Sequence, residues 1–423
     1  MSNPSDGPPL EHSVTGHSGW LRHIFRSFYG REFRILWMGA FTSTVGTWTQ
    51  EVAQNWLILT LTGSAFLLGL DAFLGDLPIV LFSLIGGVVA DRADRRRLLL
   101  ASQYLQMIFA FVLAALIYSR KVTVVHILLL SFMTGTSQAF GGPAYQSLIP
   151  SLVPKAQLPN AIALNSIQFN LARIIGPLVA GVAFSAFGAA ACFLFNGISF
   201  VAVIVSLRAL KTTFLPSASH QNLLVDLKAG LLFVRHRRSL LSLNLLAFGS
   251  TFFGIPLITM LPLFARQVFG MGPRGYSLLL SCSGCGAVLG ALTVAALGNS
   301  SNKSRTALYL QMFFGLVVVV FSCSRVLWIS LSALFLAGIA LIAVFALFSS
   351  LVQLEAPEQL RGRIMSVYMI AFRGGMPLGS LVTGFLANHI PPAVVLAGNG
   401  ACLSLIGAIS LLYWRRLGFE EAR

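Results

Sequence analysis

The chain has 423 residues, of which 56% are hydrophobic and only 10% are charged, and its mean hydropathy is +0.81. A soluble protein this apolar could not cover its surface with polar groups, so the composition indicates a membrane protein and excludes a large soluble domain. The net charge of +16 would suggest a nucleic-acid partner in a soluble protein. Basic loops on the cytoplasmic face of a membrane explain that charge better here, and we expect no nucleic-acid partner.

The first 29 residues are expected to form a cytoplasmic tail. Residues 1–19 are polar and lack the apolar core of a signal peptide. The next segment, WLRHIFRSF at 20–28, places apolar residues at helical spacing with Arg22 and Arg26 between them. It fits either a short helix on the membrane surface or a frayed tail beside the membrane.

Twelve apolar segments follow, each long enough to cross a bilayer, since a spanning helix needs about 20 residues. Their uniformly apolar character lacks the alternation of a barrel and predicts an all-α integral membrane protein. The predicted spans are 33–61, 65–90, 98–118, 124–142, 161–187, 189–210, 240–266, 276–298, 306–323, 327–352, 365–388 and 393–414.

The connection at 211–239 divides these spans six and six. It contains a basic amphipathic stretch, LLVDLKAGLLFVRHRR, and is expected to be a cytoplasmic linker. The halves also echo each other, because Arg173 precedes Pro177 in the fifth span as Arg373 precedes Pro377 in the eleventh. This repeat predicts two pseudo-symmetric six-helix bundles, at 30–210 and 240–416, with a cytoplasmic tail at 417–423.

The distribution of Lys and Arg predicts the orientation. If both termini are cytoplasmic, the basic residues outside are few, while nearly all the others fall inside. The outer ones are Arg120, Lys121, Arg266, Arg274 and Arg325. The positive-inside rule therefore predicts a multi-pass protein of the cell (inner or plasma) membrane with both termini in the cytoplasm and anionic lipids as partners.

Reactive side chains give no sign of an enzyme. All five cysteines lie in apolar segments, and the CxxC pair Cys282 and Cys285 sits among small residues, which favours helix packing over redox or metal chemistry. No Gly-Lys dipeptide occurs, so a P-loop is excluded, and the seven histidines form neither HExxH nor a cluster. We expect no enzymatic activity, metal or cofactor.

Five charged residues lie well inside predicted spans, away from the span ends, where charge is costly and commonly functional. Glu51 and Asp76 are each about ten residues from a span end and so near the midplane, whereas Asp71 is shallower and about 140° around the helix from Asp76. We expect Glu51, Asp76 and Arg173 to form a site that exchanges protons, with Asp71 the weakest candidate. A structural ion pair between Glu51 and Arg173 fits equally well.

Polar residues on the first and fifth spans repeat every three or four positions and so share a helix face. Such stripes suit the lining of a water-filled cavity, with buried hydrogen bonds between helices as the alternative. Arg373 has no acid in any carboxyl-half span, so carbonyl groups, water, a carboxylate of the other half or an anionic substrate must meet it. The cavity candidates are Thr47, Gln50, Gln54, Asn55, Asn165, Gln168 and Arg373.

The stretch GVVADRADRR at 87–96 has a Gly, an Asp four residues later and a following basic cluster. This pattern matches the signature between spans two and three of the major facilitator superfamily of secondary transporters, which the chain resembles from about residue 30 to 416. GTWTQEVAQNWLILTLTGS, LPNAIALNSIQFNLARIIGP and APEQLRGRIMSVY are similar to the branch containing the enterobactin exporter and related drug exporters. Gly176, Pro177 and Gly181 resemble an incomplete antiporter motif. One departure is that Ser131, four residues before Gly135, stands where many proton-driven relatives carry an arginine.

The resemblance implies a secondary active transporter, most simply a monomeric proton-coupled exporter of a small amphiphilic molecule that works by alternating access. Two alternatives remain: a lipid or lysolipid flippase or an importer on the same fold, and a non-transporting receptor or scaffold. A receptor would normally bring a sizeable soluble domain, which the sequence lacks.

The resemblance also implies a conformational latch around the turn at 91–97. In the superfamily, the position of Asp91 meets the cytoplasmic end of span eleven and holds that side shut. An anion near a helix amino terminus is favoured by about 0.3–2 kcal/mol, which gives such a contact a physical basis. The expected latch residues are Gly87, Asp91, Arg92, Arg95, Arg96, Arg361 and Arg363.

Overall fold

A computed structural model describes residues 26–211, 223–297 and 302–413. Within these ranges every regular element is a helix, as the sequence predicts. The long helices are α2 (Arg31–Thr62), α3 (Ala65–Arg92), α4 (Arg95–Tyr118), α5 (Val124–Leu152), α6 (Leu158–Phe187), α7 (Ala189–Ala209), α8 (Leu223–His236), α9 (Arg238–Gly254), α10 (Pro256–Gln267), α11 (Pro273–Leu297), α12 (Lys303–Cys323), α13 (Leu327–Glu355), α14 (Arg361–Ala387) and α15 (Pro392–Leu412). Short 3-10 turns are η1 (Arg26–Tyr29), η2 (Lys155–Gln157) and η3 (Glu358–Leu360).

Eleven segments in the described ranges are long and apolar enough to cross a membrane. They coincide with eleven of the twelve predicted spans. The remaining predicted span lies in α2, which has 32 residues but carries the polar stripe that lowers its hydropathy. The count of twelve therefore stays a prediction, whereas the all-helical membrane architecture is confirmed.

One detail differs from the sequence prediction. The span at 240–266 is interrupted, because Pro256 has no N–H to continue the ladder and starts a new helix, α10, directly after α9. Within the linker, the basic amphipathic stretch forms α8. The segment at 20–28, a candidate surface helix, lies mostly outside the described residues, and its last part forms η1.

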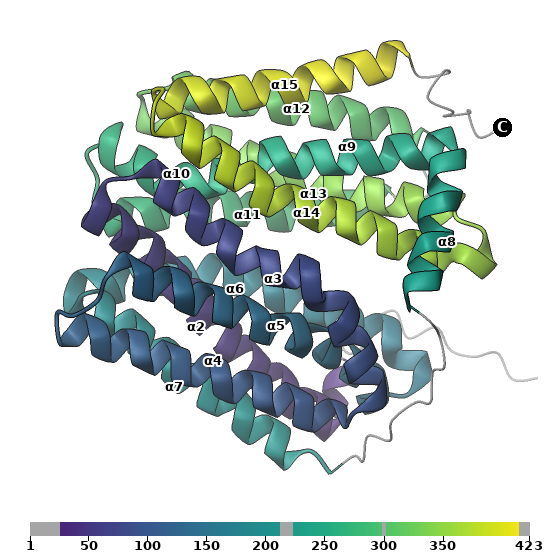
Figure 1. Cartoon of the computed structure of the whole chain (residues 1–423), viewed down its shortest axis with the longest axis horizontal. Helices are drawn as coiled ribbons and strands as arrows, with labels where there is room; N and C mark the ends of the chain where they lie inside the picture. Colours follow the sequence, from purple (N-terminus) through teal and green to yellow (C-terminus); the bar gives the residue numbers. More distant parts are fainter. Residues whose placement is uncertain (1–25, 212–222, 298–301, 414–423) are drawn as a thin grey trace, which may run out of the picture.

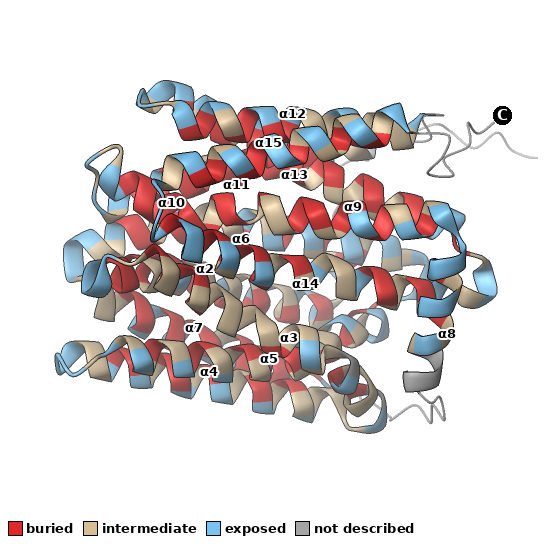
Figure 2. Cartoon of the chain, turned by 45° about the horizontal axis from the view of Figure 1, so that its top comes forward, coloured by how far each residue is buried: buried red, intermediate tan, exposed pale blue. Residues whose placement is uncertain are grey.

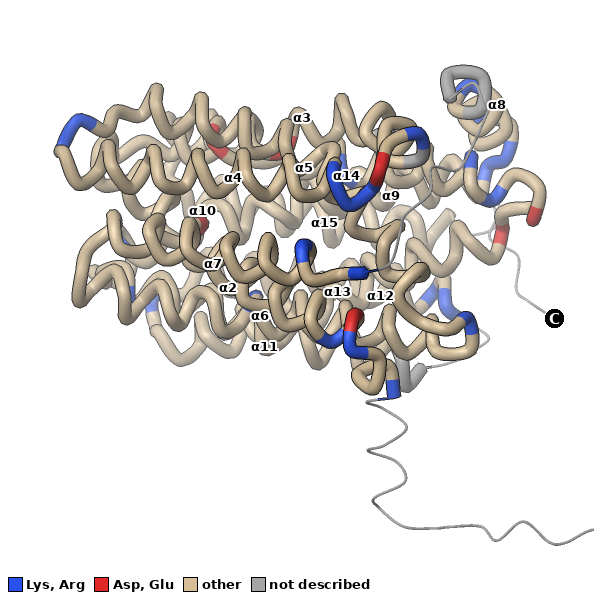
Figure 3. Tube along the Cα trace, turned by 90° about the horizontal axis from the view of Figure 1, so that it is seen from below, with Lys and Arg blue, Asp and Glu red and all other residues tan. Residues whose placement is uncertain are grey.

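The long helices lie side by side, and α8 crosses them at one end (Figure 1). We call this the basic end, because most Lys and Arg residues gather there together with the α3–α4 turn and the start of α14 (Figure 3). The opposite, or far, end carries the turns at Gly63, Gly188 and Gly270.

The outermost helices present apolar side chains to their surroundings. On α4, Leu105, Ile108 and Val112 are exposed at spacings of three and four, and exposed residues recur along the outer faces of α4 and α12 (Figure 2). A stripe of this kind would be unfavourable in water and fits contact with lipid.

The hydrophobic core is distributed asymmetrically between the two ends. At the far end one cluster joins both halves of the chain, from Val52 and Leu68 to Leu261 and Tyr276. At the basic end each half has its own clusters. The carboxyl half has one, which includes Leu240 and Ile364. The amino half has two, one that includes Leu36 and Leu210 and one that includes Phe33 and Leu164. Among the described residues, the two halves thus share a hydrophobic core cluster at the far end but not at the basic end.

Candidate functional site

Glu51 lies midway along α2 and is exposed, although Val52 and Ala53 beside it are completely buried. The charges that act on it come from Asp76 and Asp71 on α3 and Arg173 on α6. No ion pair or hydrogen bond to its carboxylate occurs within the described residues.

Arg173 does not pair with Glu51 in this conformation. Its guanidinium lies 5.6 Å from the centroid of the Trp48 ring, and its buried Nε has no hydrogen-bond partner. The ring stabilises the cation through its π face. Of the two roles that the sequence allowed, the direct ion pair is therefore not formed here, and Arg173 acts on Glu51 only through space.

Asp76 and Arg373 bring charges from the two halves toward each other. Asp76 is on α3 and Arg373 on α14, and the arginine acts electrostatically on the carboxylate. Arg373 is exposed, and no described residue forms an ion pair or hydrogen bond with it. Among the partners expected for Arg373, a carboxylate of the other half is thus nearby but not in contact.

Asp71 is held in a buried cluster that the sequence did not predict. Its Oδ2 accepts a 2.8 Å hydrogen bond from Gln54 Nε2, and its Oδ1 accepts a 2.6 Å bond from Ser131 Oγ. Gln54 Nε2 also donates to Ser131 Oγ at 2.9 Å. Three helices, α2, α3 and α5, meet at this carboxylate. The signal available in the sequence was Ser131 itself, since a small hydroxyl at the arginine position leaves room for an acid.

The polar stripe of α2 is largely occupied by hydrogen bonds. Thr47 Oγ1 donates to the carbonyl of Ser43 one turn back, and Asn196 Nδ2 on α7 donates to Gln50 Oε1 at 2.7 Å. Asn55 Nδ2 donates to the hydroxyl of Tyr276 on α11, across the two halves. Thr47, Gln50 and Asn55 nevertheless remain partly exposed. The same stripe can therefore form hydrogen bonds and still face open space.

The stripe on α6 differs from the expectation at one position. Gln168 is only 3% exposed, because its amide donates to Thr44 Oγ1 at 2.8 Å and accepts from Tyr145. The sequence predicts Gln168 as a cavity residue, with hydrogen bonding between helices as the alternative. In this conformation Gln168 forms such interhelical hydrogen bonds. Asn165, partly exposed, accepts from the same Tyr145 hydroxyl at 2.8 Å.

The antiporter-like motif lies at close helix contacts. A Cβ on Gly176 would collide with Trp48 of α2, and one on Gly181 would lie 3.0 Å from Ser277 of α11. Pro177 is buried within α6. The two glycines therefore let α6 approach both α2 in its own half and α11 in the other.

Side chains from both halves close the far end just beyond Glu51. The rings of Trp56 and Tyr276 stack at 6.4 Å. Arg266 Nη1 donates to the carbonyl of Leu59 at 2.8 Å, which places a cation at the carboxyl terminus of α2, where the helix dipole favours it. Ser64 donates to Asn388 at the edge of this closure.

The α3–α14 pair is tight at one end and open at the other. A Cβ on Gly69 would collide with the backbone oxygen of Ser380, and one on Gly384 would lie 2.7 Å from the carbonyl oxygen of Ala65. A Cβ on Gly87, near the basic end of α3, would meet nothing within 4 Å. The latch glycine is thus uncovered in this conformation.

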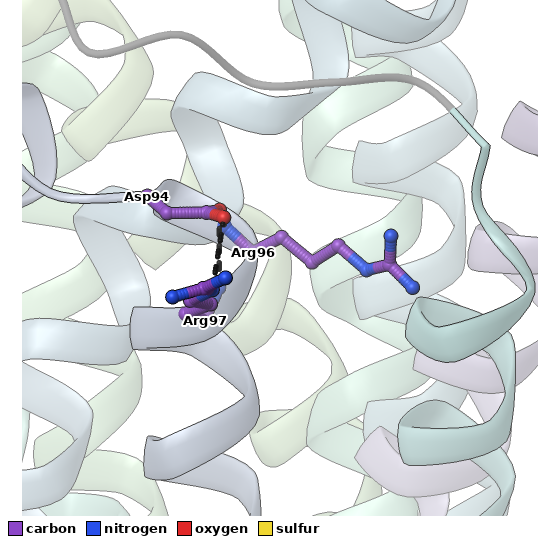
Figure 4. Close-up of polar contacts among 3 residues, drawn as sticks. All are labelled: Asp94, Arg96 and Arg97. Atoms are coloured by element: carbon purple, nitrogen blue, oxygen red, sulfur yellow. Dashed lines mark hydrogen bonds and ion pairs between the residues drawn. The ribbon is translucent and has the colours of Figure 1, made fainter.

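The arginines of the turn at 91–97 bind their own half of the molecule. Asp94 caps α4 by accepting from the backbone N–H groups of Arg96 at 2.9 Å and Arg97 at 3.3 Å (Figure 4). Arg96 Nη2 donates to the carbonyl of Arg208 at the end of α7, and Arg95 Nη1 to that of Ser147 on α5.

The other latch residues lie on α3 and α14. Arg92 is exposed at the end of α3, and Arg361 is exposed in the first turn of α14. The carbonyl of Arg363 lies against Gly230 of α8. The side chain of Asp91 lies outside the described residues, so its expected contact with α14 stays a prediction.

Comparison with known proteins gives a consistent family. The family model described as "Transmembrane secretion effector" matches residues 24–422. The chain is 26% identical over 365 residues to the staphyloferrin A transporter of Staphylococcus aureus, covering 84% of this chain and 89% of that protein. It is 21% identical over 364 residues to macrolide efflux protein A of Streptococcus pyogenes (85% and 90% covered) and 24% identical over 404 residues to the enterobactin exporter of Salmonella typhi (93% and 94%).

A solved structure shares the fold. The bacterial homologue of the lysosomal transporter Spinster, in an inward-facing and occupied conformation, superposes with a TM-score of 0.73 at 14% identity, covering 92% of this chain and 97% of that one.

Proposed function

The chain belongs to the transmembrane secretion effector family of the major facilitator superfamily, a family of multi-pass membrane transporters rather than enzymes, and we propose that it exports a small amphiphilic molecule in exchange for protons. Relatives named as exporters of macrolides, of several drugs or of enterobactin favour efflux of a drug-like or siderophore-like compound.

The observation that carries the proton mechanism is the exposed, unpaired carboxylate of Glu51 in the middle of α2. A carboxylate inside a span is costly unless it pairs, binds a proton or contacts water. Arg173 on α6 and Asp76 on α3 act on it electrostatically without a direct ion pair. A proton on Glu51 would therefore change the charge of the space that a substrate enters, and movement of Arg173 would change its proton affinity.

Alternating access is supported by the asymmetry of the two ends. One shared core closes the far end, whereas the clusters of the basic end are separate. If the basic end is cytoplasmic, this conformation is inward-open. Rocking of the halves about the sealed contacts would then open the far end while the latch around Gly87 closes the basic end.

Transport by purified protein in liposomes under an imposed pH gradient tests the proposal. A panel of siderophores, amphiphilic drugs and lysolipids would be loaded, and efflux followed with and without the gradient. We expect at least one compound to move faster when the gradient drives protons inward. Movement that ignores the gradient would refute proton coupling, and failure of every compound would favour the scaffold.

Glu51→Gln keeps the shape of the side chain but removes its exchangeable proton. We expect gradient-driven efflux to fall to the level of empty liposomes, while the unfolding temperature stays within a few degrees of wild type. The matched control is Glu358→Gln, because Glu358 is exposed in η3 at the basic end. Wild-type coupling in Glu51→Gln would transfer the role to Asp76.

A second candidate is uptake of an anion together with a proton. Arg373 is exposed and has no partner in the described part of the chain, and Arg173 Nε is also unbonded. An anion held by these arginines would disfavour release of a proton from Glu51, so that anion and proton would bind together. Substrate affinity that rises on acidification would favour this uptake, whereas competition between substrate and proton would favour exchange.

A further inference from the structure

Helix α8 is seated on the first turn of α14. Its buried face carries Leu227, Gly230 and Val234, which follow one another at helical spacing and pack into the carboxyl-half cluster with Ile364. A Cβ on Gly230 would lie 2.7 Å from the carbonyl oxygen of Arg363. The glycine thus allows direct backbone contact, and α8 cannot shift far without α14.

A second face of α8 has no partner among the described residues. Lys228, Leu231, Leu232 and Arg235 repeat at spacings of three and four and are all exposed. Leu231 is 56% and Leu232 53% exposed, and neither basic side chain has an ion pair with a described residue. This face, which we call the Lys228–Arg235 face, therefore combines two uncovered leucines with a flanking cation on each side.

The position of α8 explains what this face meets. The helix runs across the ends of the spanning helices rather than along them (Figure 1), at the end where Lys and Arg residues gather (Figure 3). That is the depth of lipid headgroups for a bundle of spanning helices. Leucines of an amphipathic helix enter the acyl boundary there, while Lys and Arg extend to the phosphates.

We propose that the Lys228–Arg235 face binds the headgroups of acidic phospholipids and thereby controls the position of α14. Arg237 and Arg238, which follow α8 and are exposed, add positive charge to the same surface. Because α8 is fixed to α14, and α14 crosses α3 at Gly69 and Gly384, acidic lipid that holds α8 outward stabilises the conformation with an open basic end. Acidic lipid then acts as a ligand that controls the opening of the basic end, which we call the gate.

The first experiment measures where the face lies. A single cysteine at Leu231, in a background without the five native cysteines, carries a bimane fluorophore in vesicles of phosphatidylcholine with 25% phosphatidylglycerol. We expect nitroxide-labelled lipid to quench it strongly. The control is Glu358→Cys, exposed in η3 at the same end of the molecule, which should be quenched far less. Equal quenching at the two positions would overturn the proposal, and so would no quenching at Leu231, which would place another segment of the chain over the face.

The second experiment measures the gate without needing the transported compound, so it can fail or succeed independently of the proposed export. Spin labels at Ala101 on α4 and Glu358 in η3, one in each half near the basic end and both exposed, report its opening by pulsed EPR. We expect the longer distance to become more populated as phosphatidylglycerol rises from zero to 25%.

Charge-removal variants separate this site from general surface charge. Lys228→Gln with Arg235→Gln should weaken the response to phosphatidylglycerol by roughly tenfold or more in lipid concentration, because each basic group near an acidic surface contributes about a fivefold preference. The control, Lys121→Gln with Arg325→Gln, removes the same charge at the far end and should respond like wild type. Equal responses of both double variants, or a wild-type distance that ignores the lipid, would overturn the proposal.

Discussion

At the scale of single residues, the chain treats its intramembrane acids in different ways. Glu51 is open to its surroundings and touches no partner in the described structure, whereas Asp71 is 5% exposed and fully engaged by Gln54 and Ser131. A buried carboxylate with two neutral donors is a structural element whose loss is costly. The environment, rather than the residue type, makes Glu51 the candidate for proton exchange.

Ser131→Ala tests the structural role of the Asp71 cluster. The substitution removes the 2.6 Å hydrogen bond and leaves a buried carboxylate oxygen unsatisfied, so we expect a loss of about 1–3 kcal/mol of stability. Thermal unfolding in detergent, followed by tryptophan fluorescence, measures it. Ser137→Ala on the same helix is the control, because the Ser137 hydroxyl donates to the carbonyl of Met133 one turn back and, among the described residues, bonds no carboxylate. Similar losses in both variants would contradict the role assigned to Ser131.

At the scale of helices, glycines decide where the halves touch. The α3–α14 pair is in backbone contact at Gly69 and Gly384 and open at Gly87, so one pair of helices carries a closed and an open end. Arg266 adds a hydrogen bond from the carboxyl half to the last turn of α2.

Gly69→Ala tests whether the contact keeps the far end closed. The added methyl group collides with the backbone at Ser380, which cannot move aside as a side chain could. We expect the distance between spin labels at Lys121 and Arg325, on exposed far-end turns of the two halves, to increase. Gly75→Ala on the same helix meets nothing within 4 Å and should leave the distance unchanged, with stability equal or up to about 1 kcal/mol higher. An unchanged distance in Gly69→Ala would show that this contact does not hold the closure.

At the scale of the whole molecule, the two ends differ in core, charge and closure. The far end shares one hydrophobic cluster between the halves, and the basic end carries α8, the α3–α4 turn and most of the positive charge. With the predicted orientation, in which the basic end is cytoplasmic, this arrangement corresponds to an inward-open conformation.

Cysteine labelling of intact cells tests the orientation. In a cysteine-free background, we expect a membrane-impermeant maleimide to label Lys121→Cys on the far-end turn, but Asn302→Cys at the basic end only after the cells are opened. Both positions are exposed, so burial cannot explain a difference. Labelling of Asn302→Cys in intact cells would reverse the predicted topology.

Gly87→Leu tests whether the basic end must close during transport. In the present conformation a side chain at Gly87 has free space, so the unfolding temperature should change little. We expect transport to be lost and the Ala101–Glu358 distance to stay long, because the leucine blocks approach of α14. The control Gly142→Leu, which also meets nothing within 4 Å, should transport normally. Full activity of Gly87→Leu would exclude a tight closure at this glycine.

Span length, hydrophobicity and the motif at 87–96 are local properties of the chain, and they were enough to predict the membrane class, nearly every long helix and the family. They also identified Glu51 as a charge deep in a span. The partners of the polar and charged side chains could be read only from the folded structure. Gln168 forms a hydrogen bond to Thr44 on another helix, and Asp71 accepts a hydrogen bond from Ser131, 60 residues away in sequence. Arg173 packs over Trp48 instead of pairing with Glu51. Such pairings depend on how helices distant in sequence rotate and cross, and hydropathy carries no information on those angles.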